Sequence, residues 1–539
     1  MHPALSDPHN LRLILEYHDP VLQSRLHENL TFFQLTKTIV AAARVCKAFS
    51  EPALDILWRR VLGLFPLFRI LPLKLINGKY VIWQRPSEIE LARFRLYGAR
   101  IKELRLVLSS ITGLTEVERH WERMDPSFYP FLLSLGFNIL PSLKVLCYDM
   151  VPEQRQLAAL ELPVFLSPSI EHLDFGRLDL GPEGSSSECE EVGRSSLMRT
   201  RISITVMHYP CANLQSACIR GRLDPQYFEL LPRFSSVKAL TLSFVDSDRP
   251  LIKALSGFDH LSYLNITLAP RVDDGLEEHD SRYRLSHLKT FILHGSAARI
   301  IHFLSHVDGE DIRSIKLSTD SRNPSALFSR ICRICELVAS FKKLEGFSLS
   351  IHDSEGRLRS GSVPDIDVKS FMEPLLQLDL KDFSCLLPAC VLVTNESARQ
   401  MVLKWRSLRT CAVNYLQTPT SAFLPPSILN HSAKHQPDLE ELVVSIDYPA
   451  RLDDADMNID PPSKHKLKVL NLGCSVFQNV ITAAIHIDSL FPYLEEVNLR
   501  FLSSIGDTTT LPLLRKTIFE RQQTRREKRA RGWRQGSLA

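Results

Sequence analysis

Residues 467–472, "LKVLNL", place a leucine first, a second apolar residue three positions later and a third two positions after that. The same arrangement recurs in "LSYLNI" (261–266), "LEGFSL" (344–349) and "LEEVNL" (494–499). In each stretch a polar residue separates the last two apolar positions, which is the alternation of a short, half-buried β-strand. Each stretch therefore predicts one strand introduced by an apolar anchor.

The pattern occurs fourteen times from about residue 99 onward, and most anchors are 23 to 33 residues apart. Longer gaps precede Leu143 and Leu214, and each can hold an insertion or a degenerate repeat. Helical stretches such as 325–341 lie between the predicted strands. One strand and one helix per unit predict a solenoid. The anchors are Ile101, Leu143, Ile170, Leu214, Val237, Leu261, Leu288, Ile312, Leu344, Leu375, Leu408, Leu439, Leu467 and Leu494.

This array resembles the leucine-rich repeat proteins of the irregular, intracellular kind. The resemblance implies an α/β solenoid with parallel strands inside and helices outside, the strands lining a concave face. Four polar stretches are expected as loop insertions between units, because each solenoid unit contacts only its neighbours. They are 181–196, 271–284, 352–367 and 448–466.

The composition is that of a folded protein with one unusual end. The chain has 539 residues, which is too many for a single ordinary core, and 44% of them are hydrophobic. Nine basic and two acidic residues between Arg515 and Arg534 give this segment a charge of +7, so the remainder of the +4 chain carries −3. The basic segment is open to three interpretations: a solvated helix end, a nuclear-import signal or a nucleic-acid patch. The acidic remainder makes nucleic acid an unlikely partner.

No motif in the sequence indicates catalysis. There is no Gly-rich phosphate loop, no G-x-S-x-G and no H-E-x-x-H, so we expect no enzyme activity and no cofactor. The pair in "CRIC" (332–335) is interpreted as buried core thiols, and no metal site is expected. Eleven scattered cysteines, no evident signal peptide and no membrane span predict a cytoplasmic or nuclear protein without a membrane partner.

The first sixty residues do not follow the repeat. Apolar periodicity predicts three helices, over 8–17, 30–49 and 50–65, with Ser50 as the N-cap of the third and Pro52 in its first turn. Three short helices make only a marginal core. Such a unit commonly finishes burying its apolar face against a partner or a neighbouring domain.

Two stretches here, 2–19 and 43–61, resemble the F-box in the variant abundant in mushroom-forming fungi. The resemblance implies docking on a Skp-family adaptor, which bridges to a cullin–RING ubiquitin ligase. The residues that carry it are expected to contact the adaptor. They are Pro8, Leu11, Leu13, Ile14, Val45, Cys46, Phe49, Pro52, Leu54 and Trp58.

The expected organisation is an F-box over 1–62, a connecting segment or repeat cap over 63–98, the solenoid over 99–505 and a basic tail over 506–539. The predicted function is substrate recognition for ubiquitin-dependent degradation, by a non-catalytic ligase subunit that binds an unknown target protein. The alternative is a repeat scaffold whose front helices only cap the solenoid. Alternation predicts these concave-face residues as the substrate site: Lys316, Ser348, Asp379, Lys381, Asn414, Glu441, Asn471, Glu496, Asn498 and Arg500.

Overall fold

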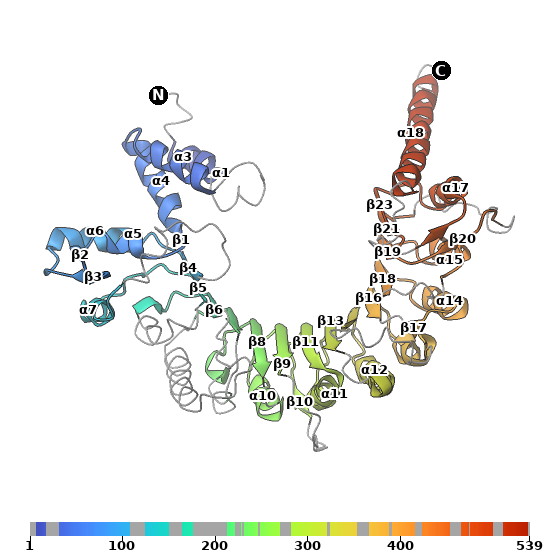
Figure 1. Cartoon of the computed structure of the whole chain (residues 1–539), viewed down its shortest axis with the longest axis horizontal. Coiled ribbons are helices and arrows are strands. Elements are labelled where there is room, and N and C mark those ends of the chain that lie inside the picture. The colour runs from blue at the N-terminus through green and yellow to red at the C-terminus, as the bar shows by residue number, and fades with distance from the viewer. Residues whose placement is uncertain are drawn as a thin grey trace. The chain divides into compact units, whose positions relative to one another are not determined.

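The fold is known from a computed structural model, shown in Figure 1. The structure describes residues 7–17, 32–107, 124–149, 164–175, 213–220, 228, 231–245, 248–269, 282–320, 324–352, 366–387, 391–415, 423–452, 465–473, 475–499 and 510–536. The chain divides into two compact units, Met1–Leu261 and Ser262–Ala539. Among the described residues, six strands follow one another in parallel in the first unit and nine in the second, in each unit in chain order.

In the first unit, a helical module precedes the parallel strands. The strands are β1 (Arg60–Val61), β4 (Glu103–Val107), β5 (Val145–Asp149), β6 (His172–Phe175), β7 (Ser216–Ile219) and β8 (Ala239–Val245). The helices are α1 (Pro8–Tyr17), α3 (Phe32–Ala43), α4 (Lys47–Arg59), α5 (Phe65–Phe68), α6 (Glu88–Gly98), α7 (Phe128–Ser134) and α10 (Asp248–Leu255). A separate antiparallel hairpin joins β2 (Leu73–Ile76) to β3 (Lys79–Ile82).

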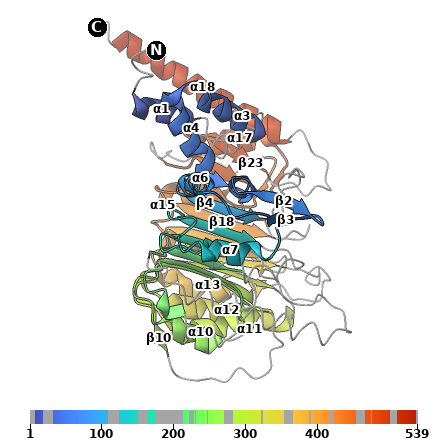
Figure 2. The same ribbon diagram turned by 90° about the vertical axis from the view of Figure 1, so that its left-hand side faces the viewer.

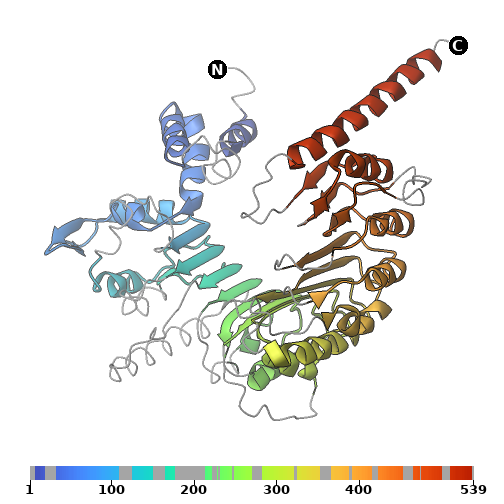
Figure 3. The same cartoon turned by 45° about the vertical axis from the view of Figure 1, so that its right-hand side comes forward.

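In the second unit, the helices lie along one side of the strands and leave the other face of the sheet open (Figures 1 and 3). The strands are β9 (Tyr263–Leu268), β11 (Thr290–Ser296), β13 (Ser314–Asp320), β14 (Gly346–His352), β16 (Asp382–Leu387), β18 (Thr410–Tyr415), β19 (Glu441–Val443), β21 (Val469–Asn471) and β23 (Glu496–Asn498). The helices are α11 (Ala297–His306), α12 (Pro324–Ala339), α13 (Lys369–Met372), the 3₁₀ helix η6 (Glu373–Gln377), α14 (Asn395–Lys404), α15 (Ser427–His435), α17 (Val480–Leu490) and α18 (Thr510–Gly536). Short parallel pairs join β10 (Tyr283–Arg284) to β12 (Val307–Asp308), β15 (Ile366–Asp367) to β17 (Val391–Leu392), and β20 (Asp447–Tyr448) to β22 (Val476–Phe477).

Thirteen of the fourteen predicted anchors lie two residues before a strand, so the repeat prediction is confirmed there. Repeated backbone hydrogen bonds explain the constant offset. The carbonyl of Lys144, for example, accepts the N–H groups of both Glu171 and His172 in the next unit, at 2.8 and 2.9 Å. The residue after the anchor thus bonds its repeat to the preceding repeat, and the strand begins immediately afterwards.

The prediction at Leu375 is wrong. Leu375 is buried in η6, and the strand of this unit is introduced by Leu380, five residues later. Both leucines are followed by apolar residues at similar spacing, so the pattern alone did not separate them. The backbone N–H groups of Lys381 and Asp382 donate to the carbonyl of Glu345, which places the offset of this repeat at Leu380.

The predicted helix boundaries near the N-terminus need correction. The helix expected over 30–49 ends at Ala43, and the helix expected over 50–65 begins at Lys47 and ends at Arg59. Ser50 therefore lies inside α4 and is not its N-cap; Cys46 holds that position and makes no side-chain cap. The helix ends early because Arg60 and Val61 enter the sheet as β1, paired with β4.

The two long gaps between anchors hold no additional strand of the sheet among the described residues. β4 pairs directly with β5, with Arg105 opposite Cys147, and β6 pairs directly with β7. The gaps therefore contain insertions, of which α7 is one. The predicted loop insertions over 181–196, 271–284, 352–367 and 448–466 fall largely outside the described residues. Within the described part of the chain, no helix combines the length and apolar character needed to cross a membrane.

Ion pairs connect some of the successive repeats at the position that follows the anchor. In the first unit, Lys144 Nζ lies 2.6 Å from Glu171 Oε1. In the second unit, Glu345 pairs with Arg313 at 3.8 Å on one side and with Lys381 at 3.0 Å on the other. These charges lie on the turn edge of the sheet, and opposite signs meet within each run. We call this set, continued by Glu440 with Lys468, the charge ladder.

Candidate interaction surfaces

The N-terminal helices form a module with a small core of its own. Leu15 of α1, Ile39 of α3, and Ala53 and Ile56 of α4 are buried together in one hydrophobic cluster. Leu11 is also fully buried. Within the described residues, three helices are present in the expected order, and α4 buries Ala53 and Ile56 while Leu54 and Trp58 are only half-buried.

Several apolar side chains of this module face solvent. Leu13 is 52% exposed and Ile14 is 45% exposed on α1, and Tyr17, Val40 and Val45 are also exposed. Three of them lie on α1, Val40 lies on α3 and Val45 lies in the turn between α3 and α4. Single exposed apolar residues are ordinary, but five in one small module are candidates for contact with a partner. We call them the apolar set of the module.

The structure divides the residues that were predicted to contact an adaptor. Leu13, Ile14, Val45 and Cys46 are exposed, whereas Leu11 belongs to the interior. Phe49, Pro52, Leu54 and Trp58 are half-buried, and the Trp58 ring packs on Tyr97 of α6 with centroids 4.9 Å apart. The backbone of Pro8 starts α1, but its side chain lies outside the described set.

Polar contacts brace the module. Arg59 Nη2 of α4 donates to Glu16 Oε1 of α1 at 2.7 Å, and this hydrogen bond holds the pKa of the Glu16 carboxyl below its ordinary value. Arg100, beyond the end of α6, binds both Glu51 and Asp55 on α4. Since α4 runs directly into β1, the module is attached to the sheet by continuous backbone as well as by side chains.

The open face of the second unit carries most residues of the predicted substrate site. Lys316 of β13 lies opposite Ser348 of β14, and Asn471 of β21 lies opposite Asn498 of β23. Glu441 and Glu496 are exposed at the starts of β19 and β23. These six residues occupy outward positions of the strands, as alternation predicted, and three of them are charged.

Two predicted site residues do not lie on this face. Asp379 and Lys381 flank the anchor Leu380 and precede β16, so they sit on the turn edge, where Lys381 belongs to the charge ladder. Their misplacement follows from the wrong anchor at Leu375. The side chain of Asn414 and the whole of Arg500 lie outside the described residues.

The basic tail is helical and docked over its first half. Leu514 and Ile518 of α18 are buried, and Arg515 donates to the Val497 carbonyl and to Asn498 Oδ1 at 2.6 and 2.7 Å. Asp488 of α17 is fully buried and is bound by two arginines of α18. Part of the charge that the sequence suggested as a free patch is therefore used in packing.

Sequence reasoning missed a polar row on the outward face of the first unit. Arg105, Cys147, Asp174 and Cys218 lie opposite one another on the four strands β4 to β7. Asp174 Oδ2 accepts from Arg220 at 3.3 Å, whereas its buried Oδ1 has no hydrogen-bond partner among the described residues. Burial raises the pKa of Cys218 to about 11, so this thiol is protonated at neutral pH. Strand alternation gives the outward direction of each residue, but the row itself appears only with the cross-strand register.

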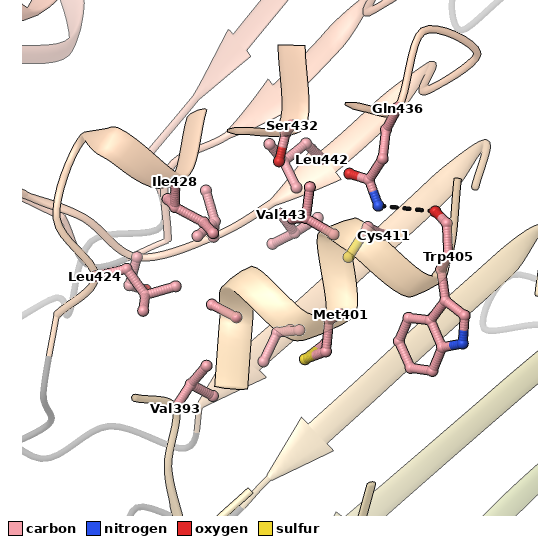
Figure 4. Close-up of a pocket in the computed structure, with 15 residues that line it drawn as sticks. Val393, Met401, Trp405, Cys411, Leu424, Ile428, Ser432, Gln436, Leu442 and Val443 are labelled. Atoms are coloured by element: carbon pink, nitrogen blue, oxygen red, sulfur yellow. Dashed lines mark hydrogen bonds between the residues drawn. The ribbon is translucent and has the colours of Figure 1, made fainter. Parts of the chain in front are cut away.

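A small apolar cavity of about 40 Å³ lies between the helices α14 and α15 and the strands β18 and β19 (Figure 4). Val443 and Cys411 line it, and burial raises the pKa of Cys411 to about 12. Gln436 Nε2 donates to the Trp405 carbonyl at 3.0 Å beside the cavity. A space of this size has room for a few water molecules, but its lining offers them few partners.

Of the two thiols in "CRIC" that were interpreted as buried, the structure buries Cys335 but not Cys332. Cys335 is fully buried in α12 and Cys385 in β16, and burial raises the pKa of both thiols. Cys332 is half-buried. Within the described ranges, no group of three or more histidine, cysteine or acidic side chains is arranged to hold a metal ion.

Comparison with known proteins places the chain in no established family. No family model matches it, and no curated protein matches it. Among solved structures, the yeast Rad7–Elc1 complex matches with 15% identity, 51% coverage of this chain, 72% of the other and a TM-score of 0.26. The leucine-rich repeat ectodomain of the Arabidopsis thaliana receptor kinase GASSHO1/SCHENGEN3, in complex with CASPARIAN STRIP INTEGRITY FACTOR 2, matches with 11% identity, 77% and 54% coverage, and a TM-score of 0.20. Both scores are too low to carry an argument.

Proposed function

We propose that the chain is the substrate-recognition subunit of a Skp–cullin–F-box ubiquitin ligase. The N-terminal module docks the Skp-family adaptor, and the open strand faces bind a target protein. The observation that carries the proposal is the apolar set of the module, together with the resemblance of residues 1–62 to the F-box. The chain itself performs no bond-making step; it raises the local concentration of the target near the ligase.

The arrangement of the module suits docking. Its core is closed by Leu15, Ile39, Ala53 and Ile56, so Leu13 and Ile14 are not required for its folding. A side chain that stays half exposed in the free protein and becomes buried in a complex contributes binding energy without first breaking internal packing. The braces at Glu16 and Arg100 also reduce the ordering cost of association.

The test is binding of the purified full-length chain to a purified Skp-family adaptor, measured by biolayer interferometry. Replacing both residues in a Leu13→Ser, Ile14→Ser variant should weaken binding at least tenfold, because apolar anchors at the centre of an interface each contribute more than about 1 kcal/mol. An Ile481→Ser variant, which removes an equally exposed isoleucine from α17, should bind normally. Absence of binding by the unaltered chain would sink the ligase proposal.

The second candidate is a protein-interaction scaffold whose front helices only cap the repeats. One observation favours it: α4 continues into β1, the first strand of its sheet, which is where a terminal cap belongs. If the front helices only cap the repeats, neither the unaltered chain nor the double serine variant should bind the adaptor. The same experiment therefore separates the two functions, while circular dichroism checks that the variants fold.

A further inference from the structure

The β2–β3 hairpin interrupts the repeat architecture. It is the one antiparallel pair among the described strands, and it pairs Leu73–Ile76 with Lys79–Ile82. The turn consists of Asn77 and Gly78, both with positive φ, at 49° and 78°. Two such residues match a tight two-residue hairpin turn. In Figures 2 and 3 the hairpin projects away from the body of its unit.

Apolar side chains are exposed at the tip on both faces. Leu75 is 50% exposed and Ile76 is 43% exposed. Because they are consecutive in a strand, they point to opposite faces of the hairpin. Trp83, just after β3, is also exposed, and Lys74 Nζ lies 5.9 Å from its ring centroid.

The segment that contains the hairpin is basic. From Val61 to Ser87 it has four basic residues and no acidic one. None of the four forms an ion pair within the described part of the chain. Lys79 does influence one nearby carboxylate, Asp125, but that group is already bound by Ser127. The four basic residues are Arg69, Lys74, Lys79 and Arg85.

The base of the hairpin is fixed to the body of the unit. The ring of Tyr80 packs against Phe65 with centroids 4.9 Å apart, and the Tyr80 carbonyl accepts from Asp125 N–H at 3.0 Å. Met124 also bridges to Tyr80. The tip is therefore presented on a rigid support, which lowers the ordering cost of contact with another surface.

We propose that the hairpin docks the protein on an anionic lipid surface, with Leu75 and Ile76 entering the interface and the basic residues facing lipid phosphates. A protein partner covering one face would leave the opposite side chain in water, whereas a lipid interface surrounds the tip. An aromatic residue close to the basic residues also suits the headgroup region. The sequence predicted no membrane partner because it holds no span, and peripheral docking requires none.

The test uses the full-length chain and co-sedimentation with vesicles. One set contains phosphatidylcholine alone, and the other contains phosphatidylcholine mixed with phosphatidylserine. We expect binding to the mixed vesicles only, weakening as salt is raised. Each basic residue near an anionic surface strengthens binding by roughly fivefold, so a Lys74→Glu, Lys79→Glu variant should bind at least about 25-fold more weakly.

Further variants test the apolar tip and the specificity of the charge effect. A Leu75→Ser, Ile76→Ser variant should reduce binding at unchanged net charge. Lys253→Glu, on the exposed surface of α10, is the charge control, and Ile481→Ser is the apolar control; both should sediment normally.

Three outcomes would overturn the proposal: no binding to mixed vesicles, equal binding to neutral ones, or binding unaffected by the hairpin variants. Adaptor binding by the same variants is expected to remain intact. Failure here is thus distinguishable from failure of the proposed ligase function, which depends on the apolar set of the module.

Discussion

Replacing Asp488 by asparagine should release the first half of α18 from α17. The Asp488 side chain is fully buried and accepts from Arg521 Nε at 3.0 Å and from Arg525 Nη1 at 2.9 Å, with Arg525 Nη2 completing a bidentate contact. An asparagine at this position keeps the size of the side chain but loses its charge and turns an amide N–H₂ toward a guanidinium. The substitution is therefore a specific test of the charge.

The magnitude follows from the contacts. Hydrogen bonds to a charged group contribute about 1.5–3 kcal/mol each. Because the two arginines are partly exposed and regain water when released, we expect the free energy that docks α18 to fall by about 3 kcal/mol in total. At roughly tenfold per 1.4 kcal/mol, the undocked fraction of α18 should rise about 100-fold.

The assay is limited trypsin digestion of the full-length chain, with mass spectrometry following cleavage after Lys516. When opening is fast relative to cleavage, the rate tracks the undocked fraction. A Glu520→Gln variant is the control, because its 3.9 Å pair with Lys516 is exposed and worth less than about 0.5 kcal/mol. A rise of less than about threefold in the Asp488→Asn variant would refute the assigned role of the buried pair.

Three further predictions concern other sites. The hydrogen bond from Arg59 lowers the pKa of Glu16, so this pair should stabilise the helical module fully at pH values above the ordinary carboxyl pKa of about 4.3. The stabilisation should be lost as the pH falls through the lowered pKa. Amide hydrogen exchange of α1 should show this pH dependence, and an Arg59→Met variant should lack it. Gly473→Ala should lower the stability of the protein to urea more than Gly78→Ala does. Both glycines have positive φ, but only the methyl group added at Gly473 would collide with a neighbouring side chain, at the Ser445 hydroxyl. Val443→Ile should stabilise by up to about 0.8 kcal/mol if its added methylene enters the cavity, and an unchanged or lower urea midpoint would show that it does not.

Much of the architecture could be predicted because the repeat signal is local. Each anchor is buried, and the aromatic residue often found three positions earlier closes the preceding turn: the Phe341 carbonyl, for example, accepts from Leu344 N–H at 3.1 Å. The repeat pattern assigned the wrong anchor where two leucines, Leu375 and Leu380, both fit the spacing. The six candidate site residues on the open strand face were found by periodicity, which reports direction but not the depth of burial.

Other features depend on contacts between distant residues and leave no local trace. The fully buried Leu11 and the half-exposed Ile14 are similar aliphatic residues three positions apart on one helix, and the packing of α1 in the module decides which is covered. The docking of α18 involves Asp488, the one acidic residue of α17, and nothing near the basic tail signals this contact. The outward row that contains Asp174 needs cross-strand register to become visible.

The charge ladder also limits how the repeat array can change its length. In the last repeats the position after the anchor holds Arg409, Glu440, Lys468 and Glu495 in turn, so the sign changes at every step. Removing the unit of Glu440 alone would bring Arg409 beside Lys468, two like charges, whereas removing the units of Glu440 and Lys468 together would bring Arg409 beside Glu495. At this part of the turn edge, gain or loss of repeats in pairs therefore keeps opposite charges side by side, whereas a change by a single repeat does not, even where the hydrophobic anchors would accept either.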